Sequence, residues 1–259
     1  MSIPVIGTAV VNSSFWVTRL LMSIDYPVDE FVIINNNGKG ELDNDLDKLK
    51  SINHKFVNKI TVCHMPRNIG VSGAWNLIIK CYMNAPYWII VNDDVSFGLG
   101  LLEEMYNHAQ DDEIGLVHGN PGDFNVGSWD LYLIKDWVIK NYGLFDENFY
   151  PAYCEDADYI MRFVHRPIKK VLSLESNYYH GLGNKDEYYT HGSQTGKVDP
   201  ELRAKLDHIN LENFSYMFEK WGEGWRYCSP SEHPYGKEEV PITYTSYNLD
   251  YVRSKNLGF

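Results

Sequence analysis

The fold class of this chain is indicated most clearly by residues 59–95, KITVCHMPRNIGVSGAWNLIIKCYMNAPYWIIVNDDV. Residues 59–65 are a short apolar run that predicts a strand, and residues 72–83 have the apolar spacing of a helix. Residues 87–95 begin as a second strand that is apolar on both faces. A strand, a helix and a further strand in this order predict a βαβ unit with parallel strands.

The same alternation continues on both sides of this unit. Upstream, we expect strands over 3–11 and 29–37, a helix over 13–24 and a polar helix or loop over 41–52. Downstream, we expect a helix over 99–110, a strand over 114–120, a strand passing into a helix over 129–149, a helix over 153–166 and a strand over 168–183. The sequence therefore predicts an α/β fold, with a mainly parallel sheet flanked by helices.

The C-terminal part of the chain follows a different pattern. Residues 199–222 predict an amphipathic helix with Pro200 at its start and Gly222 at its end. The residues after it are rich in Tyr, Pro and Ser, which favours a tail that wraps the surface. We expect residues 1–198 to form one domain, and residues 199–259 to be its C-terminal helix and tail.

The composition excludes several classes of protein. The chain has 259 residues and a net charge of −12, with no block of Lys and Arg, which argues against nucleic acid as a partner. No run approaches the ~20 apolar residues of a membrane span, and the N-terminus lacks the basic region of a signal peptide. The four cysteines are widely scattered, which is typical of reduced thiols, so we expect a soluble, cytoplasmic protein.

Two adjacent carboxylates end the buried strand of residues 87–91. Asn92 is followed by Asp93 and Asp94, and burying like charges together is costly unless a cation lies between them. A simple turn is the alternative, because Asn and Asp are common turn residues. The three preceding strands also run into small or amide residues, and ligands of parallel sheets bind at that edge. The pattern predicts a polar cleft of nucleotide size.

A second group of carboxylates opens the predicted helix of residues 153–166. Glu155, Asp156 and Asp158 would suit the positive end of the helix dipole, but three carboxylates in four positions exceed what a cap requires. His180 lies beside Gly181 at the end of the last predicted strand, and an isolated histidine there is either structural or a ligand.

Over residues 3–185 these features resemble the family 2-like glycosyltransferases of the GT-A fold. The resemblance rests on segments spread along the chain: VIGTAVVNSS (5–14), the turn Asn36-Asn37-Gly38, RNIGVSGAWN (67–76), Asn92-Asp93-Asp94, and GLFDENFYPAYCEDADYIMRF (143–163). The last segment is the longest and most specific match. More faintly, the chain is similar to glycosyltransferases encoded by large algal DNA viruses.

This resemblance implies roles for particular residues. It implies a site for Mn²⁺ or Mg²⁺, with His180 as one ligand and either Asp93 or Asp94 as another, of which we favour Asp94. A carboxylate is also needed as the catalytic base, and we favour Asp156 for it, with Glu155 beside it as the competing candidate. The residues implied in nucleotide-sugar binding are Thr8, Val10, Asn12, Asn36, Asn37, Arg67, Asn68, Gly70, Gly73, Asn92 and Asp93. Asn76, in the same segment as Gly73, is expected to be structural. Two departures from the family pattern matter: the metal motif is N-D-D instead of D-x-D, and the turn after the second strand has Asn in place of Asp.

The implied activity is inverting transfer of a sugar, with a UDP-sugar favoured as donor, to a hydroxyl of a glycan or glycoconjugate acceptor. Beyond residue 185 no family motif is matched, and we expect that segment to contribute to the acceptor side or to a subunit contact. A sugar nucleotidyltransferase is one alternative, although GTAVVNSSFW (7–16) lacks the Gly-rich basic loop of such enzymes. A non-catalytic carbohydrate-binding protein is the other.

Overall fold

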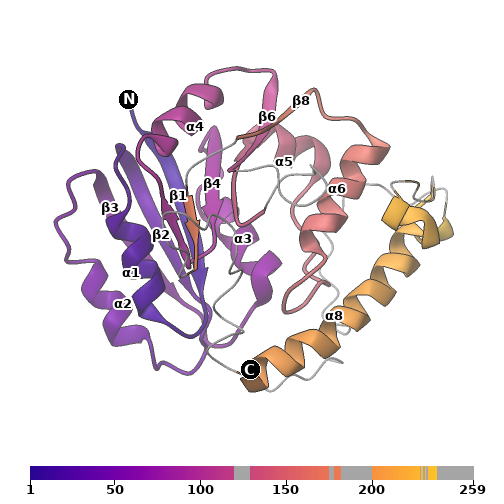
Figure 1. Cartoon of the computed structure of the whole chain (residues 1–259), viewed down its shortest axis with the longest axis horizontal. Coiled ribbons are helices and arrows are strands. Elements are labelled where there is room, and N and C mark those ends of the chain that lie inside the picture. The colour runs from indigo at the N-terminus through magenta and orange to yellow at the C-terminus, as the bar shows by residue number, and fades with distance from the viewer. Residues whose placement is uncertain are drawn as a thin grey trace.

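The structure, a computed structural model, describes residues 1–119, 129–174, 178–181, 200–227, 229, 231 and 233–237. Helices cover both faces of a central seven-stranded sheet in this part of the chain (Figure 1). The strands of that sheet are β1 (Ile3–Val10), β2 (Val28–Asn35), β3 (Val57–His64), β4 (Tyr87–Val91), β6 (Ile114–His118), β7 (Leu131–Lys135) and β8 (Lys170–Ser173). Two further strands, β5 (Val95–Phe97) and β9 (Tyr178–His180), form a small separate sheet.

The order of strands in the central sheet is β3-β2-β1-β4-β7-β6-β8. Four of its six neighbouring pairs are parallel, and only β7 runs antiparallel to its neighbours β4 and β6. The predicted α/β fold with a mainly parallel sheet is therefore confirmed.

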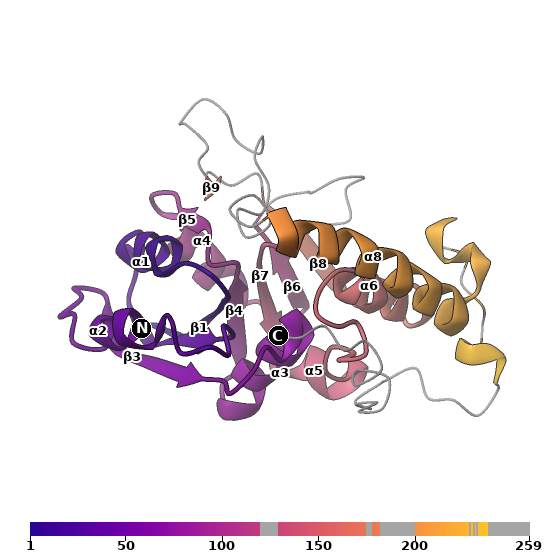
Figure 2. The ribbon, with the colours of Figure 1, turned by 90° about the horizontal axis from the view of Figure 1, so that it is seen from below.

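The helices are α1 (Ser14–Met22), α2 (Asp43–Leu49), α3 (Gly70–Cys81), α4 (Leu101–Ala109), α5 (Asp136–Tyr142), α6 (Glu155–His165) and α8 (Pro200–Trp221). Short 3-10 helices follow at Glu223–Tyr227 and Pro234–Gly236. Alternate residues of each strand face opposite sides, so the sheet has two apolar cores. Phe31 and Ile33 of β2 pack with α1, α2 and α4, whereas Val32 and Ile34 pack with α3, α5 and α6 (Figure 2). Each such fully buried side chain contributes roughly 1.5–3 kcal/mol of transfer free energy.

Helix α8 lies beside α6 in both views of the ribbon (Figures 1 and 2). Its buried residues recur every three or four positions, as in Ile209, Asn213, Met217 and Trp221, so one face is covered. That face packs on Phe149, Cys154 and Met161. The predicted amphipathic helix is confirmed, and it ends before Gly222, whose φ of 80° is favourable for glycine.

One predicted element is wrong. Residues 168–183 do not form a single strand: β8 pairs with β6 in the central sheet, whereas β9 pairs with β5 in the small sheet. The apolar run could not distinguish one strand from two, because which strand each part pairs with is not encoded in the local pattern. Residues 175–177, between these strands, lie outside the described residues, as do Asn120 at the end of the predicted strand 114–120 and most of the predicted tail, residues 238–259.

Two further observations concern the described residues as a whole. Cys63, Cys81 and Cys154 form no disulfide, and Cys228 lies outside the described residues. In the part of the chain that is described, none of the helices combines the length and the apolar character needed to cross a bilayer.

Candidate active site

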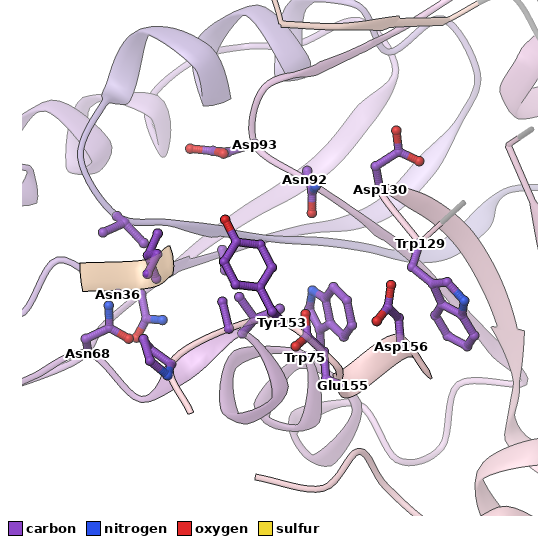
Figure 3. A pocket seen from close by; sticks show the side chains of 16 residues that line it. Asn36, Asn68, Trp75, Asn92, Asp93, Trp129, Asp130, Tyr153, Glu155 and Asp156 are labelled. Carbon is purple, nitrogen blue, oxygen red and sulfur yellow. The ribbon is translucent and has the colours of Figure 1, made fainter. Parts of the chain in front are cut away.

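A cavity of about 320 Å³ opens where β1, β2 and β4 end, between the start of α3 and the start of α6. Six residues predicted from the sequence line it: Asn36, Asn68, Asn92, Asp93, Glu155 and Asp156. In Figure 3, Asn92 and Asp93 lie along one side of the cavity, and Glu155 and Asp156 lie along the other. The tertiary structure thus brings the two predicted carboxylate groups, which are about sixty positions apart, into one cavity.

The Asp93–Asp94 pair lies in a turn between β4 and β5, closed by a hydrogen bond from Val95 N to Asn92 O at 3.2 Å. The stretch is therefore a turn, as one interpretation predicted, and the carboxylates that it carries are buried; the cation of the other interpretation stays a prediction. Asp93 and Asp94 are 6% and 3% exposed. Burial, together with the neighbouring Asp94 charge, raises the pKa of Asp93, and its buried Oδ2 has no hydrogen-bond partner.

His180 reaches this turn because β9 pairs antiparallel with β5, which places it opposite Val95. Its Nε2 lies 3.2 Å from Asp94 Oδ1, and its Nδ1 lies 3.0 Å from Asp130 Oδ2. Burial opposes the charged imidazole, but the neighbouring carboxylates of Asp130 and Asp94 outweigh it and raise the pKa of His180 to about 10. The ring is therefore a cation held between two carboxylates.

The residues at this turn suit a divalent cation in part. Carboxylate oxygens are the ligands that Mg²⁺ and Mn²⁺ prefer, and the unpartnered Oδ2 of Asp93 is a buried oxygen that a cation would satisfy. Among the described residues, no group of three or more His, Cys, Asp or Glu side chains is arranged to hold a metal by itself. A metal ion here would therefore need oxygen ligands from the substrate, and His180 would have to lose its proton before it could coordinate.

Glu155 and Asp156 open helix α6 at the opposite side of the cavity. Burial, with the adjacent Asp156 charge, raises the pKa of Glu155 to about 8, and its Oε2 has no hydrogen-bond partner. Burial also raises the pKa of Asp156, whose Oδ1 accepts a hydrogen bond from Ala157 N at 2.7 Å. A carboxylate whose pKa is raised toward neutrality is suited to general base catalysis.

Asp158, the third carboxylate of this group, points into the protein interior. Its Oδ2 accepts a hydrogen bond from Arg162 Nη2 at 2.6 Å, and its Oδ1 lies 2.6 Å from Lys220 Nζ. Asp158 is therefore structural, and two of the three carboxylates at the start of α6 face the cavity.

The asparagines of the loops both line the cavity and hold it together. Asn36 Nδ2 donates to Gly70 O at 3.1 Å, and Asn36 Oδ1 accepts from Ile69 N at 2.8 Å, so the end of β2 is tied to the start of α3. Asn68 Oδ1 accepts from Gly70 N at 2.7 Å. Asn37 does not line the cavity: its Nδ2 donates to Val11 O at 2.9 Å, which ties the ends of β1 and β2 together.

Of the two predicted glycines in this segment, Gly70 is required by the surrounding protein, whereas a side chain at Gly73 would make only an ordinary contact. Gly70 has a φ of 79°, and a Cβ there would come within 3.0 Å of the Tyr150 ring and 3.2 Å of Pro151 O. At Gly73 a Cβ would meet Ile69 at 3.4 Å. Asn76, which we expected to be structural, binds Phe145 O, Phe145 N and Glu147 at 2.8–2.9 Å. This part of the chain fixes the position of the GLFDENF segment.

Other predicted residues lie away from the cavity. Thr8 and Val10 are fully buried and do not line the cavity. Their neighbours Ala9 and Val11 line it instead, because alternate residues along a strand face opposite sides of the sheet. Asn12 is half-buried and Arg67 is exposed, and neither lines the cavity.

Sequence reasoning missed Asp130 and the apolar wall. Asp130 lines the cavity and binds His180, and Tyr178 Oη donates to it at 2.8 Å. It precedes β7, so in a parallel strand it would lie at the wrong edge of the sheet; the antiparallel direction of β7 brings it to the site. The wall consists of Trp75, Trp129, Tyr153 and Leu206. Tyr and Trp side chains present flat apolar faces with a polar group, which suits a sugar or a base.

The sequence of this chain is similar to sequences of known proteins. A family model described as "Glycosyl transferase family 2" matches residues 16–168. A curated relative, a galactofuranosyl glycosyltransferase of Leishmania donovani, is 22% identical, with 63% of this chain and 53% of the relative covered. The chain thus spans about half the length of that relative.

Solved structures share the fold. The mannosyltransferase PcManGT of Pyrobaculum calidifontis, in complex with GDP-Man and Mn²⁺, matches with a TM-score of 0.53 and 13% identity, covering 66% of this chain and 54% of that one. A fragment of S. aureus TarS in complex with UDP-GlcNAc matches with a TM-score of 0.53 and 14% identity, covering 84% and 73%. At these identities the likeness shows a common fold.

Proposed function

Because this chain belongs to glycosyl transferase family 2, we propose that it transfers a sugar from a nucleoside diphosphate donor to a hydroxyl of a glycan acceptor, with inversion at the anomeric carbon. One observation carries this proposal: Asp93 lies on one side of a single cavity, and Glu155 and Asp156 lie on the other. The wall with Asp93 is suited to a cation and a diphosphate, and the wall with Glu155 and Asp156 is suited to proton transfer.

UDP is the nucleotide that we favour, and GDP is the second candidate. Structures with this fold hold UDP-GlcNAc in S. aureus TarS and GDP-Man in PcManGT, which supports both nucleotides without deciding between them. We propose that the nucleoside lies against Ala9, Val11, Asn36 and Asn68, at the ends of β1 and β2. The backbone and amide groups there can bind a base without needing a charged side chain.

Asp94 and His180 are the residues that would hold Mn²⁺ or Mg²⁺; neither lines the cavity, whereas the adjacent Asp93 does. A bound divalent ion supplies charge neutralisation for the departing diphosphate. In a protein of net charge −12 this compensation matters, because no lysine or arginine lines the cavity among the described residues.

The reaction itself needs a base on the far side of the sugar. We propose that Asp156 accepts the proton of the acceptor hydroxyl while the hydroxyl oxygen bonds to the anomeric carbon. The bond between that carbon and the diphosphate oxygen breaks at the same time, and the nucleoside diphosphate leaves. Attack from the side opposite the leaving group inverts the configuration. Glu155, whose Oε2 has no partner in the protein, would hold an acceptor hydroxyl.

The test is a turnover assay with the full chain. UDP- and GDP-sugars are incubated with short glycan acceptors and Mn²⁺, and the released nucleoside diphosphate and the mass of the extended acceptor are measured. The anomeric configuration of the product is then read by NMR. Pyrophosphate release from a nucleoside triphosphate and a sugar phosphate would instead identify a nucleotidyltransferase. Glycan binding without turnover of any donor would identify a non-catalytic binding protein.

A further inference from the structure

The Ala152–Cys154 loop, which directly precedes the two cavity carboxylates, has an unusual backbone. Tyr153 and Cys154 have φ values of 75° and 73°, in the left-handed region that residues other than glycine rarely adopt. Glu155 and Asp156 follow directly, so the direction of their side chains depends on this conformation. Such a backbone persists only where surrounding contacts enforce it.

Helix α8 supplies that contact through one buried side chain. Asn213 is fully buried, and its Nδ2 donates to Ala152 O at 2.7 Å and to Tyr153 O at 3.0 Å. One amide group thereby binds the carbonyls of two consecutive residues of the loop. Both of those residues line the cavity, as does Leu206 from the same helix.

The helix that makes this contact lies outside the part of the chain that the family model matches, whereas the loop lies inside it. That match ends at residue 168, whereas α8 covers Pro200–Trp221. Asn213 is therefore a feature of this chain that the family assignment does not account for. Because the Asn213 side chain is fully buried, its removal leaves the carbonyls of Ala152 and Tyr153 without this donor.

We propose that Asn213 is a positioning residue that holds the Ala152–Cys154 loop so that Glu155 and Asp156 face the acceptor. The inference rests on the function proposed above for these two carboxylates. It assigns α8 to the acceptor side of the cavity, and it separates α8 from donor binding, which involves the ends of β1, β2 and β4. Loss of the amide lets the loop relax, and the base moves relative to the acceptor hydroxyl.

The experiment compares variants on one helix in the full chain. Asn213→Ala removes both hydrogen bonds, and Asn213→Ser retains one donor. Tyr216→Phe is the matched control, because it removes a buried hydroxyl of the same helix whose hydrogen bond, to Asp146 at 3.0 Å, involves neither the Ala152 nor the Tyr153 carbonyl. For each variant, kcat and the KM of donor and acceptor are measured below the melting temperature, and UDP affinity is measured by calorimetry.

We expect Asn213→Ala to lower kcat for transfer roughly 10- to 100-fold, as expected for a misplaced reacting group, with unchanged UDP affinity. Asn213→Ser should fall between wild type and Asn213→Ala, and it carries the test if Asn213→Ala does not fold. Tyr216→Phe should retain its kcat even where its melting temperature falls. A wild-type kcat in the Asn213 variants would overturn the proposal, as would an equal loss in Tyr216→Phe. Absence of transfer by the wild-type protein would instead reject the proposed function.

Discussion

Lys220 Nζ lies 2.6 Å from Asp158 Oδ1, and both side chains are completely buried. The same Nζ lies 2.6 Å from Asp146 Oδ2, and Arg162 pairs with Asp158 on its other side. Two acidic and two basic groups therefore compensate one another in the interior. Burial alone would raise the pKa of Asp158, but Lys220 and Arg162 hold it below its usual range. This network joins α8 to both acidic segments of the GLFDENF…EDAD motif.

The buried network predicts a large stability effect at Lys220. Replacing Lys220 with Met leaves Asp146 and Asp158 under-compensated, and removal of one partner of a buried pair typically costs ~3–5 kcal/mol. We expect a loss of this size in the free energy of unfolding, measured by urea titration. The double variant Lys220→Met with Asp146→Asn removes one charge of each sign, and it should be more stable than the sum of the two single effects. Simple additivity of the two effects would contradict the coupling.

A second prediction concerns the proposed metal ligand Asp94. Asp94→Asn keeps the shape of the side chain but removes its charge, so Mn²⁺ should no longer strengthen UDP binding. We expect the gain in UDP affinity on adding Mn²⁺, measured by calorimetry, to disappear while the circular dichroism spectrum stays unchanged. A variant that still responds to Mn²⁺ would remove Asp94 from the metal site.

His180 should have a weaker effect on the same measurement. Diphosphate oxygens or water can replace one ligand, so His180→Ala should weaken the Mn²⁺ dependence without abolishing it. An unaltered Mn²⁺ titration would assign His180 a structural role, as the ion-pair partner of Asp94 and Asp130.

The identity of the base is tested by two isosteric variants. A general base contributes ~10²–10⁴-fold, so Asp156→Asn should lower kcat by that factor at saturating donor while UDP affinity persists. Glu155→Gln retains a hydrogen-bonding group of the same size, so its effect should fall mainly on the KM of the acceptor. Loss of transfer in Glu155→Gln with transfer retained in Asp156→Asn would move the base to Glu155.

The raised pKa of Glu155 predicts how stability depends on pH. Its pKa is about 8 in the folded protein, against a reference value of 4.5. Between these pH values the folded state holds a proton that the unfolded state has lost, so this group lowers stability as pH rises, by up to ~1.4 kcal/mol per pH unit. Glu155→Gln removes the effect, and its stability relative to wild type should increase from about pH 5 to pH 8.

Urea unfolding at several pH values measures this difference. Glu104→Gln, on the exposed side of α4, shows how a surface substitution behaves over the same pH range. A difference between Glu155→Gln and wild type that does not change with pH would contradict the pKa shift.

Most of the strands and helices, the mainly parallel sheet and the two groups of carboxylates could be predicted from the sequence alone. These features are encoded by local periodicity and by the residues that end each strand, such as Asn92 and Asp93 after β4. The parallel arrangement then brings strand ends to one edge of the sheet, which is why Asn36, Asn68, Asn92 and Asp93 line the same cavity.

The other residues of the site are brought together by contacts that exist only in the folded protein. The antiparallel direction of β7 places Asp130 beside His180, and the pairing of β9 with β5 places His180 beside Asp94. Asn213 and Lys220 reach the start of α6 only because α8 packs along it. No local pattern specifies these contacts, because the sequence around a buried Asn or Lys in a helix does not depend on which distant residues its side chain binds. Their partners lie about fifty or more positions away and are selected by the need to pair every buried polar group.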